Sequence, residues 1–121
     1  MFRLFRRSLM SGVATNAYPL APEPAPEAFR GQVMLRTDRC RGTGDCARAC
    51  PSAAITVERA APSTWTWTLD DARCVFCGLC EAACPNQAIV LSTEFELATK
   101  DASDLVTEVT FGASPETVRT S

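Results

Sequence analysis

The sequence predicts an α+β fold in which one unit of strand, cysteine loop, short helix and strand occurs twice, with a pseudo-twofold relation between the copies. Two observations support this fold. Residues 33–91 hold all seven cysteines, with nearly the same spacing in each copy. Each copy also contains a Cys-Pro pair that is followed, two residues later, by Ala-Ile. The flanks differ in charge, since residues 1–51 carry eight Arg and four acids whereas the acids dominate after residue 85, which indicates that the two ends face different surroundings.

Residues 1–32 are predicted to form an amphipathic helix followed by a proline-rich connector. At 3.6 residues per turn, the apolar side chains of residues 1–13 fall on one face and three Arg on the flank and opposite side. This helix either packs on a protein partner or lies at a membrane surface, apolar face down. The prolines of residues 19–28 exclude a regular helix and indicate an extended connector. The apolar face comprises Phe2, Phe5, Leu9 and Val13.

Composition limits the surroundings of the chain. Arg6-Arg7-Ser8-Leu9 is similar to part of a twin-arginine export signal, but Ser11 and Gly12 interrupt the apolar run that should follow. No stretch reaches the roughly 18 apolar residues that span a bilayer. We therefore expect a cytoplasmic chain, and the net charge of −2 argues against general nucleic-acid binding.

The central domain, residues 33–91, alternates strands with cysteine loops. Period-two alternation of Thr and Trp makes residues 64–69 the clearest strand, with Trp65 and Trp67 on one face. Pro62 indicates a hairpin loop over residues 59–63. The other predicted strands are Val33–Arg36, Ile55–Val57 and Ile89–Leu91. Residues 92–121 are predicted to be an acidic tail that orders only against a partner, with a short helix over residues 94–98.

The second cysteine motif reads Cys74-x2-Cys77-x2-Cys80-x3-Cys84-Pro85. This is the bacterial run that holds iron–sulfur clusters, in which the fourth Cys binds the other cluster of a two-cluster protein. A zinc site is the alternative, but zinc ribbons use well-separated CxxC pairs. The motif therefore predicts an iron–sulfur centre.

The first motif keeps the register but lacks one thiol: Cys40-x2-Thr43-x2-Cys46-x3-Cys50-Pro51. If the fourth cysteine of each motif binds the cluster of the other motif, the seven cysteines form one complete 4Fe–4S site and one site with three thiolates. For the three-thiolate site we favour a 3Fe–4S cluster. One alternative is a 4Fe–4S cluster whose fourth iron is bound by water, Thr43 or Asp45, and the other is an empty site. The complete site comprises Cys50, Cys74, Cys77 and Cys80, and the three-thiolate site Cys40, Cys46 and Cys84.

The cysteine core of residues 33–91 resembles bacterial two-cluster ferredoxins. Residues 1–98 further resemble the iron–sulfur subunit of formate hydrogenlyase and hydrogenase-4, a relative of the two-cluster subunit of complex I. The segments that carry this resemblance are Met1-Phe2, Ala14–Leu20, Phe29–Gly31, Val75–Gly78 and Glu94–Ala98.

That resemblance implies a subunit that relays single electrons within a membrane-associated hydrogenase-like or complex-I-like assembly. It also implies that the N-terminal helix contacts the membrane arm, which places the chain peripherally at the inner face of the cell membrane. A free soluble ferredoxin is the alternative, and a zinc-binding adaptor is a remote one. The chain has no His, nucleophile elbow or phosphate loop, so we expect no catalytic site of its own.

Overall fold

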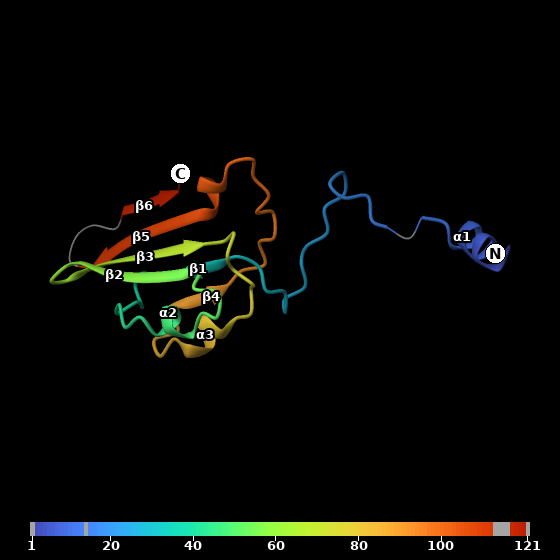
Figure 1. Ribbon diagram of the computed structural model, residues 1–121. Helices are drawn as coiled ribbons and strands as arrows, with labels where there is room; N and C mark the ends of the chain where they lie inside the picture. Colours follow the sequence, from blue (N-terminus) through green and yellow to red (C-terminus); the bar gives the residue numbers. More distant parts are fainter. Residues whose placement is uncertain (1, 14, 113–116, 121) are drawn as a thin grey trace.

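The computed structural model describes residues 2–13, 15–112 and 117–120, and its architecture is α+β (Figure 1). A four-stranded sheet lies over a smaller layer made of two short helices and a two-stranded sheet. In chain order the elements are α1 (Phe2–Ser11), β1 (Val33–Leu35), α2 (Asp45–Ala49), β2 (Ile55–Ala61), β3 (Thr64–Asp70), α3 (Leu79–Ala83), β4 (Ile89–Leu91), a 3-10 helix η1 (Ala102–Leu105), β5 (Val106–Gly112) and β6 (Thr117–Thr120).

The two-stranded sheet joins the start of the cysteine domain to its end. β1 and β4 are antiparallel, with Val33 opposite Leu91 and Leu35 opposite Ile89. The first strand of the first cysteine unit therefore pairs with the last strand of the second. This pairing holds the two cysteine loops on the same side of the molecule, where α2 and α3 contact each other.

The four-stranded sheet has the order β2-β3-β5-β6, and all its strand pairs are antiparallel. β2 and β3 form a hairpin that is longer than predicted, because β2 continues to Ala61 and only Pro62 and Ser63 turn the chain. The predicted alternation of β3 is confirmed by burial, since Trp67 and Leu69 are 1% and 0% exposed. One face of β3 thus packs on the core.

The core lies between the four-stranded sheet and the cysteine loops. It combines strand residues of both sheets with two thiols, which are the buried Cys46 and Cys80. The apolar members are Val33, Ala54, Ile55, Trp67, Leu69, Ile89, Val109 and Phe111. A chain of this size buries a modest core, so a site that adds bonds between the loops has a large effect on its stability.

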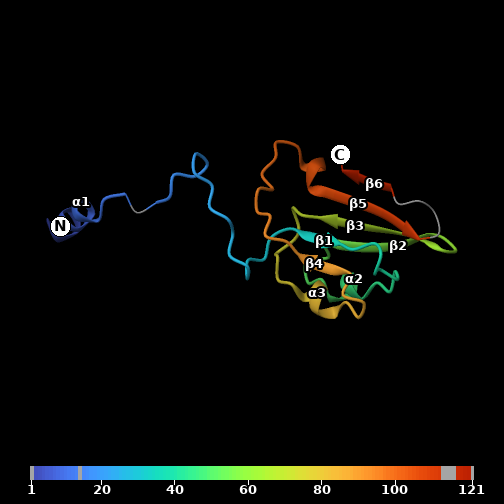
Figure 2. The ribbon, with the colours of Figure 1, turned by 180° about the vertical axis from the view of Figure 1, so that it is seen from behind.

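The N-terminal segment lies apart from this core. α1 confirms the predicted helix, has no buried residue, and stands at the far end of the connector in both views (Figures 1 and 2). The connector forms no helix or strand, as its prolines predict. Two aromatic contacts flank this connector, because the ring of Phe95 lies 6.0 Å from that of Tyr18, just before it, and 6.1 Å from that of Phe29, just after it. No helix among the described residues is long and apolar enough to cross a membrane.

Two expectations for residues 92–121 are wrong. Residues 94–98 form no helix, because the Glu94 carboxylate accepts hydrogen bonds from the N–H groups of Phe95 and Glu96. The expectation that the tail orders only against a partner fails for β5, which pairs with β3 along its whole length. The physical reason is a second period-two pattern, which buries Val109 and Phe111 on the core side of the sheet. The same expectation for residues 113–116 and 121 lies outside the described residues.

Candidate iron–sulfur site

The two cysteine loops have matching backbone conformations. Each short helix begins after a left-handed glycine, Gly44 with φ 74° and Gly78 with φ 79°. This conformation turns the loop sharply into the helix and is easily adopted only without a side chain. Each helix ends on a cysteine in extended conformation, Cys50 with φ −77° and Cys84 with φ −80°. The sequence register of the two motifs is therefore reproduced in three dimensions.

The fourth cysteine of each motif accepts the same local hydrogen bond. The N–H of Ala54 donates to the Cys50 sulfur, and the N–H of Ala88 donates to the Cys84 sulfur, both at 3.3 Å. Burial alone would raise the pKa of the Cys50 thiol, but hydrogen bonds from Ser52 and the Ala54 N–H outweigh it and lower that pKa. These donors favour the thiolate, which is the form that binds iron.

Three thiols and Thr43 line one small cavity between the first loop and the start of β4. The thiols come from both motifs, because Cys40 and Cys46 belong to the first and Cys84 to the second. Burial is the main cause that raises the pKa of Cys40 and of Cys46, and repulsion from a Cys84 thiolate raises both pKa values further. The structure thus brings together Cys40, Cys46 and Cys84, as expected from crossing of the fourth ligands.

The other four thiols gather around Cys74. Burial raises its pKa most, and repulsion from Cys50 and Cys77 raises it further. Cys80 is the most affected thiol, since burial raises its pKa to about 11, with a further contribution from Cys74. Cys50 of the first motif therefore lies with three thiols of the second. Buried thiols of this kind lose their protons when a metal binds, so metal binding and folding are coupled.

No three His, Cys, Asp or Glu side chains within residues 2–13, 15–112 and 117–120 converge closely enough to hold one metal ion. An iron–sulfur cluster distributes its thiolates over separate iron atoms, so its ligands need not converge on one point. A donor set of sulfur atoms without His also suits iron–sulfur clusters. The residues of both thiol sets therefore fit such clusters in chemistry and grouping.

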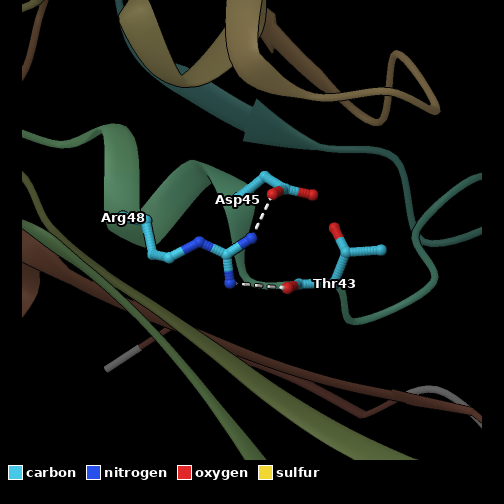
Figure 3. Close-up of polar contacts among 3 residues, drawn as sticks. All are labelled: Thr43, Asp45 and Arg48. Carbon is cyan, nitrogen blue, oxygen red and sulfur yellow. Dashed lines mark hydrogen bonds and ion pairs between the residues drawn. The ribbon is translucent and has the colours of Figure 1, made fainter.

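Three polar residues, Thr43, Asp45 and Arg48, lie at and next to the position where the first motif lacks a thiol (Figure 3). The Arg48 guanidinium forms an ion pair with the Asp45 carboxylate and donates to the Thr43 carbonyl at 3.4 Å. A hydrogen bond from the Thr43 side chain is the main cause that lowers the pKa of Asp45, with a smaller effect of Arg48. Arg48 therefore engages both the Asp45 carboxylate and the Thr43 carbonyl beside the position of the missing thiol.

Two residues of the site were not predicted from sequence. The buried indole N–H of Trp67 has no hydrogen-bond partner among the described residues, yet it faces Cys46 and lowers the pKa of that thiol against the larger effect of burial. Arg30 donates to the carbonyl of Cys77 at 3.1 Å. The alternation of β3 placed Trp67 on the core face, but no local pattern indicated which cysteine it meets.

Comparison with known proteins agrees with this geometry. Residues 39–94 match the 4Fe-4S dicluster domain family. The chain is 39% identical over 112 residues to formate hydrogenlyase subunit 6 of Escherichia coli (strain K12), covering 92% of this chain and 62% of that protein. It is 35% identical over 119 residues to NADH-quinone oxidoreductase subunit I 1 of Syntrophobacter fumaroxidans, covering 88% and 80%. The chain belongs to the family of iron–sulfur subunits that contains these two proteins.

The chain spans only part of the length of the proteins that it matches. It spans 48% of NADH-quinone oxidoreductase subunit I 2 of Symbiobacterium thermophilum, with 32% identity over 116 residues. A chain in the structure of an archaeal respiratory complex, the membrane-bound sulfane sulfur reductase, superposes with a TM-score of 0.66 at 24% identity. That superposition covers 84% of this chain and 56% of the other, and it shows a shared fold.

Proposed function

We propose that this chain relays single electrons as an iron–sulfur subunit of a membrane-associated oxidoreductase of the hydrogenase or complex I type. The grouping of seven thiols into two sets, each of which includes one cysteine of the other motif, carries this proposal. This crossing of ligands between the motifs would place two clusters side by side in one small domain, which suits electron transfer from one to the other. The family membership supports the same assignment.

The ligand assignment follows the two sets. Cys50, Cys74, Cys77 and Cys80 would hold a 4Fe–4S cluster, and the other three would hold a 3Fe–4S cluster in a pseudo-twofold arrangement. The three-iron form is favoured over a cubane with an Asp45 ligand because the Asp45 carboxylate forms an ion pair with Arg48. The hydroxyl of Thr43, the other oxygen near this corner, is a poor ligand for iron compared with a thiolate.

When bound, such clusters supply one-electron redox chemistry. The protein supplies burial and hydrogen-bond donors. Cys46 and Cys80 are 8% and 7% exposed, which keeps water from their sulfur atoms. The N–H groups of Ala54, Phe76 and Ala88 donate to cysteine sulfurs, which stabilises the more negative, reduced state of a cluster.

We further propose that α1 attaches the chain to the inner face of the cell membrane or to the membrane subunits there. Phe2, Phe5 and Leu9 are 91%, 67% and 71% exposed on α1, and its other side carries Arg. An isolated helix with this amphipathic pattern is typical of an interfacial segment. Its separation from the cysteine domain leaves the apolar face open to a partner.

Anaerobic purification with iron and sulfide analysis and EPR tests the cluster assignment. We expect about seven irons and eight sulfides per chain, with an oxidised three-iron signal and a reduced cubane signal. About four irons with the cubane signal alone would mean that the three-thiolate site is empty. About eight irons and two cubanes would contradict the three-iron assignment, and absence of iron would overturn the whole proposal.

Sedimentation with anionic lipid vesicles tests the membrane proposal. We expect the full chain to bind, Phe5→Glu to abolish most binding, and Ser11→Glu to have a smaller effect because Ser11 lies on the opposite face of α1. Failure of the full chain to bind vesicles, together with a monomeric soluble state, would favour a free ferredoxin.

A further inference from the structure

The two cysteine motifs carry opposite charge. Residues 36–50 of the first motif contain four Arg and two Asp, whereas the equivalent residues 70–84 of the second contain one Arg, two Asp and one Glu. The first segment therefore has a net charge of +2 and the second a net charge of −2. The first cysteine loop thus presents a basic surface that the second loop lacks. Its exposed arginines are Arg36, Arg39, Arg41 and Arg48.

One cavity beside this basic segment reaches a ligand of the three-thiolate set. It has a volume of about 410 Å³, and Arg36 and Arg39 line it together with Cys84. Glu81 is the one acidic residue of its lining. Arg39 pairs with Asp38 at 3.8 Å, but Arg36 takes part in no ion pair within the described part of the chain. The charge of Arg36 is therefore available to a partner.

A second cavity reaches another ligand of the same set, at the border with strands β3 and β5. It has a volume of about 310 Å³, and its lining includes Arg41, Cys40 and the rings of Trp65 and Phe111. The two rings stack at 6.1 Å between centroids, and the Arg59 guanidinium lies 5.6 Å from the centroid of the Trp65 ring. Aromatic side chains and Arg are enriched at protein–protein interfaces, so this combination is typical of a docking surface.

The ligands that line the two cavities are the accessible ones of the three-thiolate set. Cys40 and Cys84 are partly exposed, whereas Cys46 is buried. Electron tunnelling weakens steeply with distance, so a partner exchanges electrons fastest where the ligands of a cluster approach the surface. The positive charge and the route to the cluster therefore coincide on this surface.

We propose that residues 36–41, together with Trp65, form the docking surface for an electron-transfer protein whose own redox centre lies beneath an acidic surface. This inference rests on the proposed function, because it requires a cluster at the three-thiolate site. Protruding carboxylates of the partner enter the two cavities and meet the arginines, which steers the encounter. One electron passes between the partner's centre and the cluster, and no bond or proton is exchanged.

The test uses the full chain with its clusters, purified anaerobically, and reduced flavodoxin as the probe, because flavodoxins are acidic proteins that donate single electrons. Stopped-flow absorbance follows the flavin as its anionic hydroquinone loses one electron to become the neutral semiquinone. The three-iron EPR signal of freeze-quenched samples reports reduction of the cluster. We expect the second-order rate constant to fall at least tenfold between about 10 mM and 1 M salt, where the Debye length shortens from about 30 Å to 3 Å.

Charge-reversal variants locate the surface. Arg36→Glu and Arg41→Glu should each lower the rate constant roughly three- to tenfold at about 10 mM salt and match the parent at about 1 M salt. Lys100→Glu is the matched control, because it makes the same change in net charge at an exposed residue between β4 and η1. It should stay within about twofold of the parent. A redox titration of each variant separates docking from driving force, since a changed potential alters the rate at every salt concentration.

The cubane EPR signal reports correct folding in every variant. The net charge of −2 alone would make the rate constant rise with salt, and that result would overturn the docking surface while leaving the proposed function intact. Equal slowing by Lys100→Glu would also overturn it. Unchanged rates in both Arg variants, with weaker sedimentation of Arg36→Glu on anionic vesicles, would assign the surface to lipid headgroups instead. A three-thiolate site without iron would overturn this inference, whereas absence of all iron would overturn the proposed function as well.

Discussion

Replacing Trp67 by Phe should lower the reduction potential of the three-thiolate cluster. The indole N–H of Trp67 is buried, has no hydrogen-bond partner among the described residues and faces Cys46. A cluster at this site offers that donor a negatively charged acceptor. Because the acceptor gains charge on reduction, the hydrogen bond is stronger in the reduced state and raises the potential.

The size of this effect follows from the energy of one hydrogen bond. A net contribution of about 0.5–1.5 kcal/mol, taken as the difference between the two redox states, is a reasonable scale. For a one-electron couple, a tenfold change in equilibrium or 1.4 kcal/mol corresponds to about 59 mV. Trp67→Phe should therefore lower the potential by roughly 20–60 mV. The smaller ring should also cost about 1–2 kcal/mol of stability by leaving a cavity.

An EPR-monitored redox titration measures this change. Trp65→Phe is the matched control, since Trp65 lies two residues away on the same face of β3 but stacks on Phe111, at 6.1 Å between ring centroids. The control and the potential of the other cluster should stay within about 10 mV of the parent, well below one hydrogen bond. An unchanged or higher potential in Trp67→Phe would refute the donor role.

Other substitutions test the site and the core. Cys84→Ser should remove the three-iron EPR signal and keep the cubane signal, whereas Cys50→Ser should remove the cubane signal and keep the three-iron signal. Loss of the cubane in Cys84→Ser, or of the three-iron cluster in Cys50→Ser, would contradict the crossing of ligands between the motifs. Gly42→Ala should destabilise the fold by about 1–3 kcal/mol in urea unfolding, because Gly42 has φ 66° and a Cβ there would lie 2.4 Å from the Trp65 ring. An unchanged urea midpoint of unfolding would show that the loop moves to make room for the methyl group. Leu69→Ala, at a position with 0% exposure, should cost about 2–5 kcal/mol in the same assay; a cost below 1 kcal/mol would mean that the surrounding core collapses into the space.

The sequence predicted those helices and strands whose pattern of apolar and polar residues is clear within the element itself. The Thr/Trp alternation predicted β3, and the amphipathic pattern predicted α1. β5 escaped prediction because its own signal is weak and its stability comes from β3, about forty residues earlier in the chain. The predicted helix at residues 94–98 failed for the opposite reason, since the side chain of Glu94 bonds to the backbone N–H groups that follow it.

The site divides in the same way. The cysteine spacing predicted which thiols gather, because the loop register fixes their order around a cluster. It did not predict that Arg48 engages both the Asp45 carboxylate and the Thr43 carbonyl. Those contacts depend on α2 beginning at Asp45, which places Arg48 one turn later on the same face. The approach of Trp67 to Cys46 depends on how a distant strand packs over the loop.

The pairing of β5 with β3 also orders events during synthesis of the chain. The last cysteine is residue 84, whereas β5 comprises residues 106–112, so the whole ligand set emerges from the ribosome before the sheet can close. Until then one edge of β3 carries unpaired backbone groups beside its tryptophans, and such an edge invites pairing with other chains. β5 can therefore cover this edge only after every cysteine of the two motifs has been synthesised.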